Sequence, residues 1–173
     1  MREIPLSRGL VAIVDDEDFE RFGALRWHAH ESAPGLFYAM RGVGVRPNHR
    51  KVYLHREIMD AERGVAVDHV NGNRLDCRRS NLRLCTLTQN QGNRVRNRRS
   101  SSRFKGVSLE HTGRWRAAIT FQRQLRRLGS FVREEDAARA YDASARECFG
   151  QFARLNFPEV GERSALDNRE NAA

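Results

Sequence analysis

Four polar residues in the middle of the chain have types and spacings that suit phosphodiester hydrolysis. Asp68 and His69 are adjacent, Asn81 follows twelve residues after the histidine, and Asn90 nine residues later. Hydrolysis needs a base that deprotonates water and a cation that holds phosphate oxygens. Histidine suits the base because its unperturbed pKa lies near neutrality. Carboxylate and amide oxygens are ligands that Mg²⁺ or Mn²⁺ accepts. A metal-dependent phosphodiesterase site is therefore one interpretation of the pattern.

Two metal-binding alternatives fail on spacing, and one structural alternative stays open. A calcium loop starting at Asp68 needs oxygen ligands at positions three and five, but these are Val70 and Gly72. A zinc finger would need paired cysteines or a second nearby histidine. An ordinary polar hairpin remains open, because Asn-Gly pairs form turns and single asparagines often close hairpins or cap helices.

The surrounding residues predict a strand, a loop, a return strand and a helix. Residues 65–70 form the first strand, 71–80 the loop and 81–86 the return strand, and Thr88 caps the helix that carries Asn90. Adjacent residues of an ideal strand point to opposite faces. Asp68 and His69 can therefore serve one site only near a strand end or a distortion.

Positive charge is concentrated in one block of the chain. The 173 residues carry a net charge of +9, and residues 94–133 contain twelve Lys or Arg against one Asp or Glu. Such a block is expected for a polyanionic partner, because each neutralised phosphate releases counterions. Nucleic acid is favoured over a membrane, since the block lacks a long amphipathic helix. A solvated basic face is the alternative.

Composition also indicates the cellular compartment in which the protein is expected. The three cysteines form no C-x-x-C pair, which predicts free thiols in a reducing cytosol. No apolar run approaches a membrane span, and the first residues do not resemble a secretory signal. We expect a cytoplasmic protein of a bacterial or phage-infected cell.

The second half predicts three antiparallel strands followed by a helix. KGVSLE, RWRAAITFQ and QLRRLGSF are separated by short turns, and residues 133–150 form the helix, with an acidic first turn that suits the helix dipole. The apolar face of the middle strand comprises Trp115, Ala117, Ile119 and Phe121. The apolar stripe of the helix, which would cover that face, comprises Ala137, Tyr141, Ala145 and Phe149.

The stretch VDHVNGNRLDCRRSNLRLCTLTQNQGN resembles HNH nucleases of the ββα-metal fold, in the branch of phage and intron-encoded homing endonucleases. The resemblance implies that His69 is the general base and that Asp68 and Asn90 ligate one divalent ion, Mg²⁺ or Mn²⁺. Asn81 would hold the loop and orient the imidazole. Asn93 is the alternative ligand if the register shifts.

The flanking HREI adds His55, for which we expect structural support first and phosphate or metal contact second.

Residues 103–158 resemble the apetala-two/ethylene-response-factor (AP2/ERF) DNA-binding domain of plants, through FKGVSLEHTGRWRAAI, LGSF, AARAYDASA and LNFP in that order. In that family the sheet lies in the major groove with the helix behind it. The family's DNA-contacting positions can be transferred to this chain, but only two of them still hold a positively charged residue. The expected DNA-contacting residues on the sheet are Lys105, Ser108, Arg114, Arg116, Thr120, Arg126 and Arg127. Those expected in the preceding basic stretch are Arg94, Arg96, Arg98, Arg99 and Arg103.

We therefore predict an α+β chain with five segments: a mixed strand and helix region at 1–54, an HNH module at 55–93, a basic linker at 94–102, an AP2-like domain at 103–158 and a polar tail at 159–173. The predicted function is a homing-type DNA endonuclease that leaves 5′-phosphate and 3′-hydroxyl ends. Its partner is double-stranded DNA, with no membrane and no small-molecule substrate, and the chain acts as a monomer or weak dimer.

Two other functions compete with the endonuclease. The chain could be a DNA-binding transcriptional regulator whose nuclease module is a scaffold, although a scaffold would not need all four polar residues. It could also bind RNA, but it lacks the exposed aromatic platform that single strands prefer.

Overall fold

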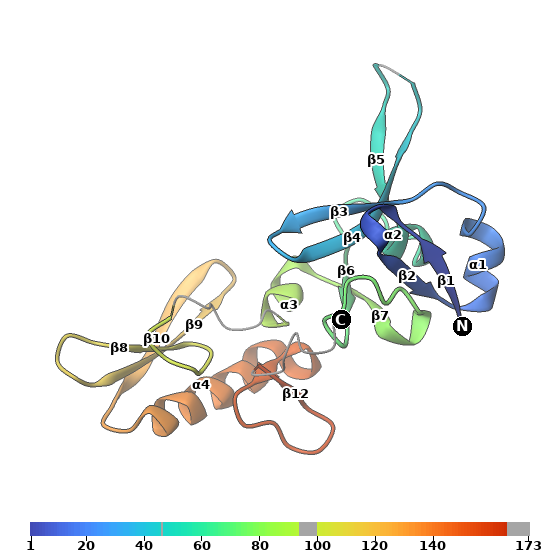
Figure 1. Cartoon of the computed structure of the whole chain (residues 1–173). Coiled ribbons are helices and arrows are strands. Elements are labelled where there is room, and N and C mark those ends of the chain that lie inside the picture. Colours follow the sequence, from blue (N-terminus) through green and yellow to red (C-terminus); the bar gives the residue numbers. More distant parts are fainter. Residues whose placement is uncertain (46, 94–99, 166–173) are drawn as a thin grey trace. The chain divides into compact units, whose positions relative to one another are not determined.

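The computed structural model describes residues 1–45, 47–93 and 100–165, which divide into two compact units, Met1–Thr86 and Leu87–Ala173 (Figure 1). Both units combine short strands with helices, which confirms the predicted α+β class. None of the described helices is long and apolar enough to cross a membrane.

The first unit is built from small antiparallel sheets and short helices. The strands are β1 (Arg2–Pro5) paired with β2 (Val11–Val14), β4 (Leu36–Val43) between β3 (His28–Ala33) and β5 (Arg50–Tyr53), and β6 (Ala66–His69) paired with β7 (Leu82–Cys85). The α-helices are α1 (Asp16–Phe22) and α2 (Leu54–Ile58), and the 3-10 turns are η1 (Ser7–Gly9) and η2 (Arg79–Asn81).

One apolar core connects these sheets and helices. Ile4, Val14, Leu54 and Ile58 are almost completely buried in it, together with Trp27. The core therefore joins residues from β1, β2 and α2, and it anchors the segment that leads into the Asp-His pair.

The sheet formed by β3, β4 and β5 has two different faces. Alternate residues of one strand share a face, as do directly paired residues of neighbouring strands. Ala29, Ala39 and Val52 lie on the face that is buried in the core. Tyr38 and Tyr53, both half-buried, lie on the other face. Beyond the core, β4 and β5 continue as a hairpin that extends away from the rest of the unit (Figure 1).

The second unit contains the predicted three-stranded sheet and its helix. The antiparallel sheet has the order β10 (Gln124–Phe131), β9 (Trp115–Phe121), β8 (Val107–Leu109). The other elements are α3 (Leu87–Gly92), α4 (Glu134–Phe149), η3 (Gly150–Phe152) and the parallel pair β11 (Arg154–Leu155) and β12 (Arg163–Ser164).

The predicted packing of α4 on the sheet is confirmed. Ala117 and Ile119 of β9 are buried, and so is the helix stripe from Ala137 to Phe149. Gly106 sits against Tyr141 of this stripe with φ of 75°, and a Cβ at that position would overlap the tyrosine ring. Close approach and backbone conformation therefore both require glycine there.

The segment from 100 to 102, which the sequence assigns to the basic linker, is part of the second unit. Ser102 is buried, and its hydroxyl donates to Glu134 at 2.6 Å. The Ser100 hydroxyl donates to the carbonyl of Val107 at 3.0 Å. These hydroxyls bind helix and sheet atoms directly, so the second unit begins earlier than expected.

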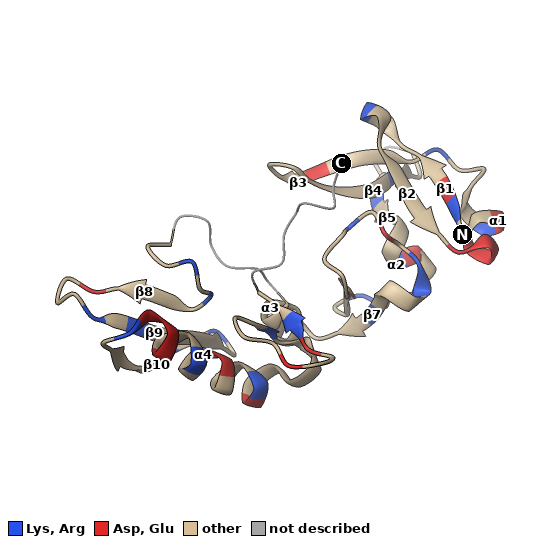
Figure 2. Ribbon diagram, turned by 60° about the horizontal axis from the view of Figure 1, so that its bottom comes forward, with Lys and Arg blue, Asp and Glu red and all other residues tan. Residues whose placement is uncertain are grey.

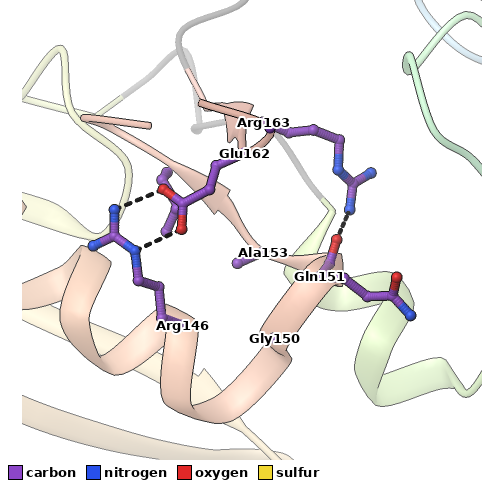
Figure 3. Close-up of a pocket in the computed structure, with 8 residues that line it drawn as sticks. Arg146, Gly150, Gln151, Ala153, Glu162 and Arg163 are labelled. Atoms are coloured by element: carbon purple, nitrogen blue, oxygen red, sulfur yellow. Dashed lines mark hydrogen bonds and ion pairs between the residues drawn. The ribbon is translucent and has the colours of Figure 1, made fainter. Parts of the chain in front are cut away.

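The predicted polar tail is also corrected up to residue 165. β12 pairs with β11, and Ala165 is buried. Glu162 accepts two hydrogen bonds of 2.7 Å from Arg146 of α4, and Arg163 donates to the carbonyl of Gln151 at 2.6 Å (Figure 3). Arginine pairing therefore orders residues whose polarity predicts fraying. Residues 94–99 and 166–173 lie outside the described residues.

The three cysteines are free thiols, as predicted. Cys77 and Cys85 are buried in the first unit, and burial raises their pKa values to about 12 and about 11. Cys148 is half-buried on α4.

Candidate active site

His69 is the last residue of β6, which places the Asp-His pair at a strand end. Asp68 is paired with Arg83 and His69 with Leu82 across the two-stranded sheet. The chain then turns, because the amide of Gly72 donates to the carbonyl of His69 at 2.9 Å. The strand end is the position at which adjacent residues can serve one site, as the sequence required.

Asn81 holds the loop between β6 and β7. Its side-chain oxygen accepts a hydrogen bond from the amide of Asn71 at 2.9 Å, and its side-chain nitrogen donates to the carbonyl of Asp76 at 2.7 Å. The amide of Val70 donates to the carbonyl of Asn81 at 2.8 Å. The buried Asn81 thus fixes the backbone of Val70 and Asn71, the two residues that follow His69.

The far side of this loop is attached to the N-terminal elements. The amide of Cys77 donates to the carbonyl of Ile13 in β2 at 2.7 Å. Arg79 donates two hydrogen bonds, of 2.9 and 2.7 Å, to the fully buried carboxylate of Asp18 in α1. The region before residue 55, to which the sequence gave no role, therefore supports the loop between β6 and β7.

Asp68 is buried and ion-paired. Arg83 donates to its Oδ2 through Nε at 2.9 Å and through Nη2 at 2.7 Å. A carboxylate removed from water needs such a partner. The pair keeps an anionic oxygen donor beside His69, which is what a hard divalent cation would require.

His69 belongs to a cluster of rings in the first unit. Its ring centroid lies 5.0 Å from that of His55 in α2 and 6.0 Å from that of Tyr38 in β4. Tyr38 and His55 are themselves 5.1 Å apart, and Tyr53 is 5.8 Å from both of them. The predicted base is therefore held by aromatic contacts from α2 and the three-stranded sheet.

Burial keeps both imidazoles neutral. It lowers the pKa of His69 to about 4, although the Asp68 carboxylate acts in the opposite direction. Burial, followed by the charge of His69, lowers the pKa of His55 to about 3. An uncharged imidazole at neutral pH is the form that accepts a proton from water.

Arg74 is a residue of this site that the sequence did not identify. Its guanidinium lies 4.8 Å from the Tyr38 ring centroid, and its Nη1 donates to the Ser32 hydroxyl at 2.7 Å. Its charge contributes to the lowered pKa values of His55 and His69. Arg74 lies in the loop stretch that the sequence analysis singled out. The direction in which its side chain points depends on Ser32 and Tyr38, which are far away in the chain.

The remaining predicted ligands lie in the second unit, on and after α3. Asn90 is half-buried on α3, which begins at Leu87, so Thr88 lies inside the helix and does not cap it. The side-chain oxygen of Asn93 accepts hydrogen bonds from Arg154 at 2.8 Å and Arg163 at 2.7 Å. Asn93 therefore has a structural role within the second unit.

Among the described residues, no group of three or more His, Cys, Asp or Glu side chains could hold a metal ion. The predicted ligands are instead one carboxylate and one amide oxygen, from Asp68 and Asn90. Oxygen donors of this kind fit Mg²⁺ or Mn²⁺ better than zinc.

The residues predicted to contact DNA before the sheet are only partly described. Arg94, Arg96, Arg98 and Arg99 lie outside the described residues. Arg103 is exposed and 3.2 Å from Glu135. Lys105 is buried, with its Nζ donating to the carbonyl of Gly92 at 2.7 Å, so its charge is used inside the unit.

On the sheet, most predicted contacts share the face opposite α4. Arg116 donates to Ser108 at 3.1 Å, and Thr120 and Arg127 are exposed on the same face. Arg126 is an exception, because it pairs with Ile119 and lies 5.2 Å from the Phe121 ring on the helix side.

Arg114 precedes β9, is exposed and donates to the carbonyl of Ser130 at 2.8 Å. Figure 2 marks the Lys and Arg residues of the sheet in blue and the acidic start of α4 in red.

A strand that ends in Asp-His, a loop closed by an asparagine and an antiparallel return strand give the strand–loop–strand arrangement expected of the ββα-metal nucleases that this stretch resembles. Residues 52–91 match the family described as HNH endonuclease. A protein of Acanthamoeba polyphaga mimivirus, named an uncharacterized HNH endonuclease, is 28% identical over 150 residues, 87% of this chain and 76% of the viral protein. These matches confirm the predicted resemblance to HNH endonucleases and support a nuclease function.

Plant proteins match a smaller part of the chain. An AP2/ERF and B3 domain-containing protein of Oryza sativa subsp. japonica is 47% identical over 66 residues, and an AP2/ERF and B3 domain-containing transcription factor of Arabidopsis thaliana is 42% identical over 60 residues. The matches cover 38% and 35% of this chain but only 18% and 17% of the plant proteins. They confirm the AP2/ERF resemblance for about this share of the chain.

Proposed function

We propose that the chain is a site-directed DNA endonuclease of homing type. One observation carries the proposal: His69 ends β6 beside the buried carboxylate of Asp68, and Asn81 fixes the loop that follows. HNH nucleases are the class to which this arrangement and the family match point.

His69 acts as the general base. Its lowered pKa, about 4, leaves the imidazole unprotonated at neutral pH, ready to take a proton from water. The rings of His55 and Tyr38 restrict its orientation. The water oxygen bonds to phosphorus and the bond to the 3′ oxygen breaks, which leaves 5′-phosphate and 3′-hydroxyl ends.

Asp68 would ligate one divalent cation, Mg²⁺ or Mn²⁺, and Asn90 is the second ligand that the HNH resemblance implies. When bound, the cation supplies positive charge to the non-bridging and leaving oxygens. Asn90 is a better candidate than Asn93, because the side-chain oxygen of Asn93 already accepts hydrogen bonds from two arginines.

The second unit would position the DNA. The outer face of its sheet carries Arg116, Thr120 and Arg127, and relatives that share the AP2/ERF resemblance include a transcription factor. One site per chain implies that a monomer nicks one strand. A double-strand break then needs two chains or two sequential cuts.

The decisive test is nicking of supercoiled plasmid that carries the gene's own flanking insertion site. The wild-type protein should nick it with Mg²⁺ or Mn²⁺ and not with chelator. His69→Ala should lower the nicking rate by roughly 10²- to 10⁴-fold, the usual contribution of a general base. His111→Ala, which removes an exposed imidazole of the second unit, should keep the wild-type rate.

Two controls define the outcome. Thermal unfolding of His69→Ala separates lost chemistry from lost structure, and His69→Gln provides a second variant of similar polarity. Tight binding of this DNA without cleavage in either metal would contradict the endonuclease and favour the DNA-binding regulator.

A further inference from the structure

The face of the three-stranded sheet that contacts the imidazole pair continues along the β4–β5 hairpin. In the pairing register Met40 is opposite Tyr53, and Gly42 is opposite Lys51. Lys51 and Tyr53 are alternate residues of β5, so their side chains share a face. That face is the one on which Tyr53 lies 5.8 Å from the His55 ring centroid.

Two nitrogen-bearing side chains extend this face toward the hairpin tip. Lys51 is exposed, and its ammonium group has no hydrogen-bond or ion-pair partner within the described residues. The imidazole of His49 lies directly over Gly42, in the space that a side chain at position 42 would occupy. Both groups can donate hydrogen bonds outward.

The other end of the face carries Arg74. Its contacts with Tyr38 and Ser32 place its guanidinium on the same side of the sheet as the two tyrosines. Tyr38 and Gly42 are four residues apart in β4, which is roughly 13 Å at 3.3 Å per residue. Arg74 and Lys51 therefore lie at two ends of a surface, and the rings of His55 and His69 lie beside this surface between them.

This surface carries no carboxylate from its own strands. Glu31 is the single Asp or Glu of β3, β4 and β5. It is paired with Phe37 on the opposite face, where Arg8 donates to it at 2.9 Å. Lys51 and Arg74 form no ion pair within the described residues, so their charges match a phosphate backbone.

We propose that this face of β3, β4 and β5 is a second DNA-binding surface, on which the sugar-phosphate backbone next to the cleaved bond lies, with Lys51 and Arg74 as phosphate contacts. The inference rests on the proposed endonuclease, because that function brings duplex DNA to His69. It makes the nuclease unit a DNA-binding element in its own right, separate from the AP2/ERF-like sheet.

Arg50 provides a matched control for Lys51. The two cations are neighbours on β5 and both are exposed, but Arg50 is paired with Val43 on the face that leads into the core. Within the described residues its guanidinium, like the Lys51 ammonium, has no hydrogen-bond or ion-pair partner. If only the total positive charge matters, Lys51→Ala and Arg50→Ala should weaken DNA binding equally. If DNA lies on the Lys51 face, Lys51→Ala should weaken it more.

The experiment measures binding of the full chain to a short duplex with the flanking insertion site, in chelator, by fluorescence anisotropy over a series of salt concentrations. Lys51→Ala should weaken binding roughly three- to tenfold and lower the slope of log affinity against log salt by about 0.9, the value for one phosphate contact. Arg50→Ala should change both quantities by less than half as much. Lys51→Arg should restore the wild-type slope.

Equal effects of Lys51→Ala and Arg50→Ala, or no effect of either, would overturn the inference. Nicking assays with Mg²⁺ separate this result from a failure of the proposed function. There, Lys51→Ala should raise the DNA concentration at half-maximal rate and leave the maximal rate unchanged. If the wild-type chain does not nick, the endonuclease fails, while the binding comparison still decides whether this face holds DNA.

Discussion

Two ion pairs, one in each unit, use charged side chains in opposite ways. In the first unit, Asp18 is fully buried and its carboxylate is held by Arg79 at 2.7 and 2.9 Å. In the second, Glu110 and Arg127 are 3.4 Å apart on the outer face of the sheet, and the Arg127 side chain is 68% exposed. The first pair fixes the loop after His69, whereas the second leaves a cation accessible to a ligand.

This difference shows why counts of charge along the sequence locate binding surfaces poorly. Residues around the catalytic loop are rich in arginine, but Arg78, Arg79 and Arg83 are each bound to an aspartate. Lys51 belongs to a region whose charges cancel in the sequence, yet it is exposed on a face to which β3, β4 and β5 contribute no acid. Whether a charged side chain is paired within the protein therefore indicates a binding surface better than the number of charged residues in a segment does.

The largest effect is expected from breaking the buried pair. Asp18→Asn should lower the free energy of unfolding by about 2–3 kcal/mol, because the fully buried side chain at position 18 loses its charge-assisted hydrogen bonds with Arg79. Urea denaturation followed by Trp27 fluorescence, in a Trp115→Phe background, would measure it. Asp16→Asn, at an exposed carboxylate of the same helix, should cost much less, because its ion pair with the N-terminus is screened by solvent. Similar small costs for both variants would remove the contrast between the units.

A change of pH should affect the first unit more than the second. His55 and His69 have folded-state pKa values of about 3 and about 4, below the unfolded value of 6.5, so the unfolded chain binds more protons between these values. Their neutral forms contribute stability that is complete above pH 6.5 and decreases as the pH falls. At pH 5 the loss reaches about 2 kcal/mol for each imidazole.

Hydrogen exchange at pH 7 and pH 5 would measure this difference, once the intrinsic exchange rates are corrected for pH. Peptides from residues 1–86 should lose protection at the lower pH, and His55→Phe should reduce that loss because one titrating ring is removed. Equal losses in both units would contradict the assignment to the buried imidazoles.

The smallest effect is expected at the exposed pair. Glu110→Gln should change the free energy of unfolding by less than about 1 kcal/mol, because its partner Arg127 is 68% exposed and the amide can still accept from Ser130. It should tighten DNA binding slightly, since the one acidic residue of the 94–133 block is neutralised. Weaker binding would show that Glu110 positions Arg127 for DNA and does not merely shield it.

The sequence predicted those strands and helices in which apolar residues recur at a regular interval. The strand around Asp68 and His69, its return strand and the sheet with α4 lie where the patterns place them, because alternation and the i, i+4 stripe report burial directly. The loop-holding role of Asn81, which the HNH resemblance implies, depends only on local contacts, since both of its side-chain hydrogen-bond partners lie within ten residues.

The rest could not be predicted because it depends on distant partners. Tyr38 reaches His69 only through the pairing of β3, β4 and β5, and nothing near Tyr38 in the sequence indicates a catalytic neighbour. Lys105 was expected to contact DNA because it matches a contact position of the AP2/ERF family, but the carbonyl of Gly92 and the ring of Tyr141 receive its ammonium group inside the unit. Arg126 and Arg127 differ only in the side of the strand they occupy.

The burial of two of the three thiols offers a practical route to labelling. Cys77 and Cys85 are buried and protonated at neutral pH, so a maleimide dye should react with Cys148 on α4 without any cysteine being replaced. With a second dye on the DNA, energy transfer would then report, during a single turnover, where the second unit sits on its target when the strand is cut.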